Sequence, residues 1–429
     1  MKKQLLFFFF CTSLMLNGQT TSKIEPGLKQ KLQSDKRLEL VKNMAEDLIK
    51  EGFTAGSGYA EVWIRDLNTF IETASIVGDK NKVKESLIVF FKLQGADGNI
   101  PDGYTPVKEA QVSYNYTFSD LAPQYAAHKN TVETDQESSL VQAIQKYIHT
   151  TGDKSILNER VGEFTVDERI NNAMQFLMDN RYNQHYGLLW GATTVDWGDV
   201  QPEHEWGVNI DDDSHFCIDI YDNAMFIVAL NNYIEITNSA ENKKKWSKVC
   251  LQIEKNVRKH LWDKKNRKFI PHIYLSGSPF PDDFNENLIH YHGGTTIAIA
   301  AGLLSKPEIL TVYNQMQDNV KAAGAQTIGL TIYPVYPNGF FKNVAMHEYG
   351  YQNGGDWTWF GGRMVQQLIN NRFYEEAYEA ISPMLDRVIK EKGFYEWWTP
   401  EGEPKGSGEF RGSAGVLWKA IIQFEELSL

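Results

Sequence analysis

Helical periodicity recurs along the whole chain, and this repetition constrains the fold more than any other feature. Apolar residues at spacings of three and four mark helices in twelve stretches: 27–51, 66–79, 82–94, 134–150, 167–180, 217–236, 241–261, 294–304, 307–319, 357–370, 373–392 and 412–427. Alternating strand patterns are confined to short candidates such as Thr327–Val335. Twelve helices pair naturally into six helical hairpins, so the pattern predicts an all-α fold.

The helices alternate in character along the chain. The odd-numbered ones, such as 27–51, are rich in Lys and Glu, whereas the even-numbered ones, such as 412–427, are apolar or small. This alternation predicts an (α/α)6 barrel with the even helices as its inner ring. Loops rich in Trp, Tyr, Gly, Asp or Glu precede the inner helices: Tyr59–Asp66, Glu133–Ser139, Thr194–Asn223, His290–Thr295, Tyr351–Trp359 and Tyr395–Ser413. We expect all six loops to converge at one mouth of the barrel.

The first nineteen residues read as a signal peptide. They combine Lys2 and Lys3 with a short apolar run and small or polar residues, and the run is too short to span a membrane. Residues 20–429 are then expected to form a single catalytic domain, exported to the periplasm or secreted, with no membrane span. The net charge of −12 disfavours binding to nucleic acid or to an anionic membrane.

Cysteine and histidine usage gives no sign of a metal centre. Cys217 and Cys250 remain after removal of the signal peptide, and they either form one disulfide or are two buried thiols. No zinc-type spacing occurs. The acidic run Asp211–Asp213 reads best as a solvated turn, with a cation site as the alternative. We therefore expect neither a metal nor a cofactor.

Two stretches place carboxylates among aromatic residues. Asp196 and Asp199 are bracketed by tryptophans, and Glu396 lies between Tyr395 and Trp397. Burial among indoles raises the pKa of a carboxyl group, which keeps it able to donate a proton near neutrality. A pair of carboxylates brought together by the fold is what glycoside hydrolysis requires.

Two further stretches offer groups for a sugar. Arg65 and Asp66 follow Trp63 at the start of an expected helix, where a forked guanidinium beside a carboxylate can hold two hydroxyls. The other stretch is Tyr351–Trp357, in which two glycines allow close backbone approach to a ligand. The candidate substrate-binding residues are Trp63, Arg65, Asp66, Trp197, Asn353, Asp356, Trp357 and Trp397.

Taken in order, these stretches resemble the six-hairpin glycosidases of the glycogen-debranching, family 63 glucosidase and neutral-invertase kind. The resemblance runs from about Gly58 to Phe424 and rests on four motifs: Tyr59–Asp66, Trp197–Asp199 continuing to Tyr221–Leu230, Tyr351–Trp357, and Tyr395–Gly402 continuing to Gly412–Gly415. Three features depart from the family pattern. An acidic insertion follows Asp199, and Asp356 stands where a small or apolar residue is more common. The chain also lacks room for the N-terminal β-domain of many members.

The resemblance implies particular roles. Asp199, rather than Asp196, falls on the general acid, Glu396 falls on the general base, and Arg65 and Asp66 fall on residues that hold the terminal sugar. The expectation is an inverting exo-glycosidase acting on α-glucosides or related α-linked disaccharides. The alternatives are a sugar epimerase, a uronyl hydrolase or a lyase on the same barrel, or a glycan-binding protein without catalysis.

Overall fold

The computed structural model describes residues 24–110 and 115–428. The proposed signal peptide lies outside these residues. Six helices form a closed inner ring, in which each contacts the next and the last contacts the first: α3 (Ile64–Val77), α5 (Gln136–Thr151), α7 (Ile220–Ile236), α9 (His292–Ala300), α11 (Thr358–Asn370) and α13 (Arg411–Ser428). The predicted (α/α)6 barrel is therefore confirmed, and the inner ring consists of the helices predicted from their apolar character.

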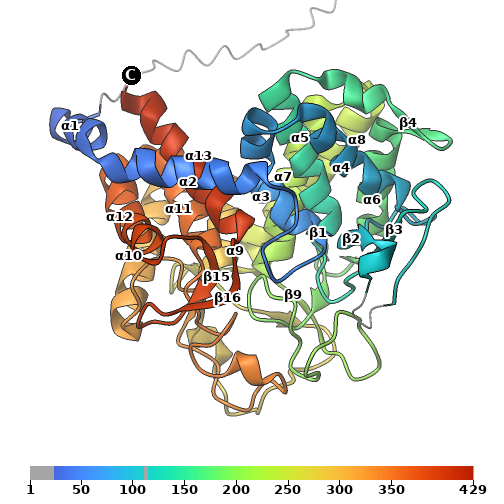
Figure 1. Cartoon of the computed structure of the whole chain (residues 1–429). Coiled ribbons are helices and arrows are strands. Elements are labelled where there is room, and N and C mark those ends of the chain that lie inside the picture. Colours follow the sequence, from blue (N-terminus) through green and yellow to red (C-terminus); the bar gives the residue numbers. More distant parts are fainter. Residues whose placement is uncertain (1–23, 111–114, 429) are drawn as a thin grey trace, which may run out of the picture.

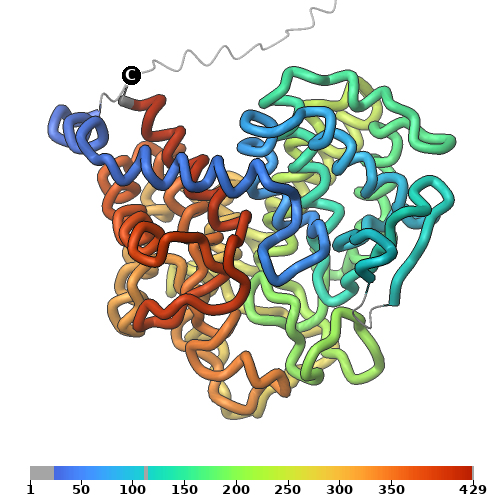
Figure 2. Tube along the Cα trace, in the orientation of Figure 1, coloured from blue at the N-terminus to red at the C-terminus, as the bar shows by residue number. Residues whose placement is uncertain are grey.

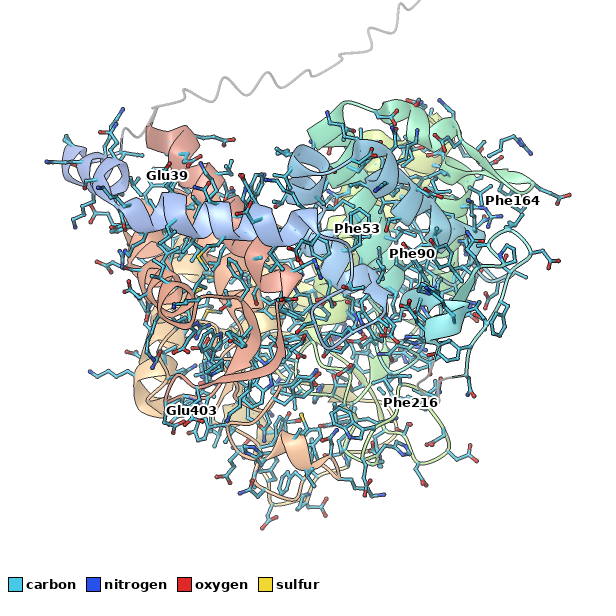
Figure 3. The ribbon with its side chains drawn as sticks, in the orientation of Figure 1. Glu39, Phe53, Phe90, Phe164, Phe216 and Glu403 are labelled. Atoms are coloured by element: carbon cyan, nitrogen blue, oxygen red, sulfur yellow. The ribbon has the colours of Figure 1, made fainter. Side chains whose placement is uncertain are left out.

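Six further helices pack outside the ring, each against at least one inner helix next to it in the chain: α2 (Lys36–Lys50), α4 (Lys80–Lys92), α6 (Val166–Asn180), α8 (Ala240–His260), α10 (Lys306–Ala323) and α12 (Tyr374–Glu391). Their one-sided burial explains their composition. In α2 the residues Leu38, Val41, Ala45 and Ile49 are buried at helical spacing, while Glu39, labelled in Figure 3, lies on the exposed face.

The first predicted helix, 27–51, is two helices in the structure. A short α1 (Pro26–Ser34) ends before Asp35, whose carboxylate accepts a hydrogen bond from the backbone N–H of Arg37 and so caps α2. A capping carboxylate at this position starts a new helix, which the uninterrupted apolar spacing did not reveal. Figures 1 and 2 show α2 running alongside α13, so both ends of the described chain meet where the ring closes.

Short strands and 3-10 turns shape the connections. The strands are β1 (Val62–Trp63), β2 (Gly103–Pro106), β3 (Tyr125–His128), β4 (Arg160–Val161), β5 (Phe164–Thr165), β6 (Tyr182–Asn183), β7 (Leu188–Leu189), β8 (Gly191–Ala192), β9 (Phe216–Ile218), β10 (Trp262–Asp263), β11 (Lys268–Phe269), β12 (Ile273–Tyr274), β13 (His290–Tyr291), β14 (Ile332–Tyr333), β15 (Tyr395–Trp398) and β16 (Pro404–Gly408). The 3-10 turns are η1 (Val107–Glu109), η2 (Lys154–Asn158), η3 (Glu286–Leu288) and η4 (Val344–Met346). Within residues 24–110 and 115–428 all the strand pairings are antiparallel and no sheet has more than three strands, so the strands brace loops rather than form a core sheet.

Three further expectations concern the described residues. Both Cys217 and Cys250 are buried free thiols, which resolves the alternative of a disulfide. These residues include no group of three or more His, Cys, Asp or Glu side chains arranged to hold a metal ion. None of the helices placed in the structure combines the length and apolar character needed to cross a membrane.

Candidate active site

A cavity of about 510 Å³ opens at the N-terminal ends of the inner helices, a size within the usual range for small-molecule sites. Four of the six predicted loops line it, namely those before α3, α7, α11 and α13. The remaining two loops support residues of the lining. Glu133, before α5, accepts a hydrogen bond from Arg65. The backbone N–H groups of Gly293 and Gly294, in α9, donate to Asp196. The predicted convergence on one mouth therefore agrees with the geometry.

Seven of the ten predicted site residues line this cavity: Trp63, Arg65, Asp66, Trp197, Asp199, Trp357 and Glu396. The side chains of Trp197, Trp357 and Trp359 make its apolar floor, with ring centroids of Trp197 and Trp357 4.7 Å apart and those of Trp197 and Trp359 5.2 Å apart. Flat aromatic faces of this kind suit the apolar faces of sugar rings.

Three of the predicted contacts do not fit the structure. Asn353 is fully buried and donates to the carbonyls of Tyr336 and Met346 while accepting from the N–H of Tyr336. Asp356 is also fully buried, where it accepts hydrogen bonds from Thr327 and Arg387. Both side chains hold the loop together behind the cavity wall. The third, Trp397, packs against Tyr351 at a centroid distance of 6.3 Å and is not among the lining residues.

Glu396 is the most completely held carboxylate of the cavity. Its Oε1 accepts a hydrogen bond from the hydroxyl of Tyr59 at 3.0 Å, and its Oε2 accepts one from the backbone N–H of Ser407 at 2.8 Å. A Cβ on Gly406 would collide with Oε2, so this position of the β15–β16 hairpin requires glycine. Burial, with a smaller contribution from the charge of Asp199, raises the pKa of Glu396 to about 7 against the opposing effect of the two donors.

Asp199 faces the same cavity and is half-buried. Its Oδ1 accepts a hydrogen bond from Nε2 of Gln352 at 2.8 Å. Because Gln352 itself is buried, it fixes the direction of the carboxylate while leaving the other oxygen open to a ligand. Asp199 can therefore contact a molecule bound in the cavity while its orientation stays fixed.

Asp196, the other carboxylate in this stretch, stabilises the start of α9 and is not part of the cavity lining. Its two carboxylate oxygens accept hydrogen bonds from the backbone N–H groups of Gly293 and Gly294 at 2.7 and 2.8 Å, in the first turn of α9. Helix N-termini stabilise negative charge in this way. Burial nevertheless raises the pKa of Asp196 to about 8. The contact anchors the turn that presents Trp197 and Asp199 to the cavity.

We therefore expect Asp196→Ala to lower the free energy of unfolding by about 2 to 3 kcal/mol, because two buried amide donors lose their acceptors. Asp196→Asn should also destabilise the protein, since its amide N–H₂ would face one of these donors. Urea unfolding measures both changes. Wild-type stability in Asp196→Asn together with a complete loss of activity would instead identify Asp196 as the reacting acid.

Arg65 is engaged more fully than its sequence position suggests. Its Nε and Nη2 donate to the two oxygens of Asp102, each at 3.0 Å, and its Nη1 donates to Glu133 at 2.8 Å. The forked interaction expected with a sugar is therefore made with Asp102, which leaves two of the five N–H donors of the guanidinium. Next to it, Asp66 is buried, and this burial raises its pKa to about 7.

The list of predicted site residues left out several residues that line the cavity, although Tyr351 and Trp359 lie in a loop that was expected at the mouth: Tyr59, Tyr351, Gln352, Trp359 and Phe410. Tyr59 was part of a recognised motif, but no local pattern indicated that its hydroxyl reaches Glu396. Gln352 lies beside the predicted Asn353, and Tyr351 has a left-handed backbone with φ of 42°. This irregular backbone directs Gln352 to the cavity and Asn353 away from it, which side-chain type alone does not predict.

An (α/α)6 barrel with a cavity lined by tryptophans and by the carboxylates Asp199 and Glu396 fits a carbohydrate-active enzyme of the glycoside hydrolase class. The chain belongs to the glycosyl hydrolase 94 superfamily, whose catalytic-domain model matches residues 40–339. This agrees with the resemblance to six-hairpin glycosidases inferred from the motifs. A comparison of the sequence with curated proteins finds no match.

Solved structures support the same fold at low sequence identity. The GH63 mannosylglycerate hydrolase from Thermus thermophilus in complex with glucose has a TM-score of 0.62 at 13% identity, over 88% of this chain and 99% of that chain. Its complex with Tris and D-glycerate gives 0.64 at 16% identity, over 88% and 100%. A rhamnosidase from Klebsiella oxytoca with rhamnose bound gives 0.57 at 13% identity, over 90% and 63%.

Proposed function

We propose that this glycoside hydrolase is an inverting exo-glycosidase acting on α-glucosides or related α-linked disaccharides. The observation that carries the proposal is that Asp199 and Glu396 line one cavity, each with its carboxylate oriented by hydrogen-bond donors of the protein. Glucose bound in the structurally similar mannosylglycerate hydrolase supports a glucose-like terminal sugar. The signal-like residues 1–19 support export to the periplasm or secretion.

In the proposed reaction, Asp199 donates a proton to the glycosidic oxygen as the bond from that oxygen to the anomeric carbon breaks. Glu396 accepts a proton from a water molecule, whose oxygen attacks the anomeric carbon from the opposite face of the ring. Inversion needs space for that water between the carboxyl groups, which are about 6.5–9.5 Å apart in inverting enzymes. The hydrogen bonds from Tyr59 and the Ser407 amide, which fix the orientation of the Glu396 carboxylate, support this role.

The lining also bears on the alternatives. No histidine is among the described residues that line the cavity, which disfavours an epimerase with histidine proton carriers. In the part of the lining that the structure describes, the three carboxylates Asp66, Asp199 and Glu396 accompany one cation, Arg65. An acidic cavity of this kind disfavours anionic substrates such as those of uronyl hydrolases and lyases.

The stereochemistry of the first product tests the proposal. Proton NMR during hydrolysis of an α-glycoside should show the β-anomer before mutarotation, because water attacks opposite the leaving group. Initial accumulation of the α-anomer, or a trapped glycosyl group on Glu396, would mean that Glu396 is a nucleophile. No hydrolysis by the wild type, with sugar binding retained, would favour the glycan-binding alternative.

The pH profile gives a second test. As general base, Glu396 acts in its ionised form, so kcat/KM should rise with pH through its pKa of about 7. The hydrogen bond from Tyr59 lowers this pKa, so Tyr59→Phe should move the acidic limb to higher pH. Rates measured across buffers for both proteins check this sign. An acidic limb that stays in place in Tyr59→Phe would remove Glu396 from the ionisation that controls the rate.

A further inference from the structure

The acidic insertion after Asp199 forms one wall of the cavity mouth. Five of its residues line the cavity: Val200, Trp206, Gly207, Val208 and Asn209. Its run of acids, Asp211–Asp213, is exposed and is not part of the lining. The wall that faces the cavity is therefore uncharged, although the insertion as a whole is acidic. We refer to residues 200–210 as the mouth loop.

The mouth loop is attached to the barrel at both ends. The N–H of Thr131, in the loop before α5, donates to the carbonyl of Val208 at 2.6 Å, and the hydroxyl of Thr131 accepts from the N–H of Ile210 at 2.8 Å. Lys342 donates its backbone N–H to the carbonyl of Pro202 at 3.0 Å. These anchors fix the backbone on either side of Trp206, so that its indole has a defined place at the mouth.

Trp206 is a cavity-lining residue that is 68% exposed. Its ring meets that of Tyr351, across the mouth, edge to face at a centroid distance of 6.3 Å. An exposed indole in the lining of a cavity offers a flat apolar face to a bound ligand. Trp206 also follows the proposed acid Asp199 in the same loop, and the acid must lie beside the glycosidic oxygen of the leaving group.

The charges around the mouth restrict what that leaving group is. The single cation of the described lining is Arg65, which is already bonded to Asp102 and Glu133. A carboxylate-bearing leaving group, such as the D-glycerate bound in the similar hydrolase structure, would meet three acids in this lining and one cation whose charge is already balanced by two carboxylates. We infer that Trp206 stacks on a neutral ring, a second sugar, and that it makes the enzyme selective for such leaving groups over carboxylate-bearing ones. This inference rests on the proposed function.

Three substrates that share one terminal sugar test the inference: an α-linked glucose disaccharide, α-glucosyl-D-glycerate and α-glucosyl fluoride. Fluoride leaves without needing a contact to Trp206, so it reports on the terminal-sugar site and on the general base alone. We expect wild-type kcat/KM to favour the disaccharide over the glycerate conjugate. Trp206→Ala should lower kcat/KM for the disaccharide by about tenfold, with the rate on the fluoride and the melting temperature unchanged.

Two controls sharpen the result. Trp206→Phe keeps an aromatic face and should retain most of the disaccharide activity. Phe118→Ala removes another exposed aromatic ring, which is 65% exposed and lies outside the cavity lining. This second change should leave the rate on all three substrates unchanged. An equal loss on disaccharide and fluoride, or a wild-type preference for the glycerate conjugate, would overturn the inference while leaving the proposed function in place. No turnover of any of the three substrates by the wild type would overturn both.

Discussion

Glu396→Gln is expected to lower kcat/KM on α-linked disaccharides by about 10²- to 10⁴-fold, because glutamine cannot accept the proton of the attacking water. The amide oxygen can still accept from the N–H of Ser407, and the amide N–H₂ can donate to the hydroxyl of Tyr59, the two groups that now hold the carboxylate, so the hairpin should keep its conformation. Steady-state rates and a thermal melt of the same preparation measure the two effects separately.

Glu403→Gln is the matched control for this change. Glu403, labelled in Figure 3, is exposed on the same β15–β16 hairpin, where it pairs with Lys405. Exposed pairs of this kind contribute little to stability, so the variant should be close to wild type in both measurements. Full activity in Glu396→Gln would exclude Glu396 as the base, whereas an equally large loss in both variants would point to damage to the hairpin.

Asp199→Asn should cause a loss of similar size, about 10²- to 10⁴-fold, on disaccharides, because the leaving sugar then departs without a proton. The loss should be much smaller on α-glucosyl fluoride, whose leaving group needs little protonation. Glu396→Gln should be impaired on both substrates, since each requires an activated water. The ratio of the two rates in each variant therefore assigns the acid and the base.

The opposite pattern, with fluoride hydrolysis retained in Glu396→Gln and lost in Asp199→Asn, would exchange the two roles. The raised pKa of Glu396 makes this comparison informative, because a pKa near neutrality serves an acid as well as a base. Asp212→Asn, in an exposed part of the same insertion, controls for a general effect of removing negative charge near the mouth.

Much of the fold could be predicted because it depends on local regularities. Apolar spacing located the helices, and the contrast between the Lys- and Glu-rich α2 and the apolar α13 separated outer from inner helices. The alternation of outer and inner helices along the chain then placed the loops rich in Trp, Tyr, Gly, Asp or Glu at one end of the ring. The break at Asp35 was missed because one capping side chain, rather than a change in the apolar pattern, ends one helix and begins the next.

The candidate site was less predictable, because chemical type does not decide which way a loop residue points. Asn353 and Asp356 have the groups that bind hydroxyls, yet they are used up by hydrogen bonds within the protein. Arg65 reaches the cavity, but most of its donors are taken by carboxylates that lie 37 and 68 residues further along the chain. Partners so distant in the chain cannot be identified from the residues that flank Arg65.

The sequence by itself determined the periodicity, the number of helical hairpins and the stretches that carry carboxylates among aromatic residues, since each depends on residues close together in the chain. The resemblance favoured Asp199 over Asp196, but only the tertiary structure gave the physical reason: Asp196 caps α9, whereas Asp199 faces the cavity three residues later. The tertiary structure also brought Tyr59 to Glu396 and Gln352 to Asp199. These pairings depend on closure of the helical ring, which joins loops more than 150 residues apart in the chain.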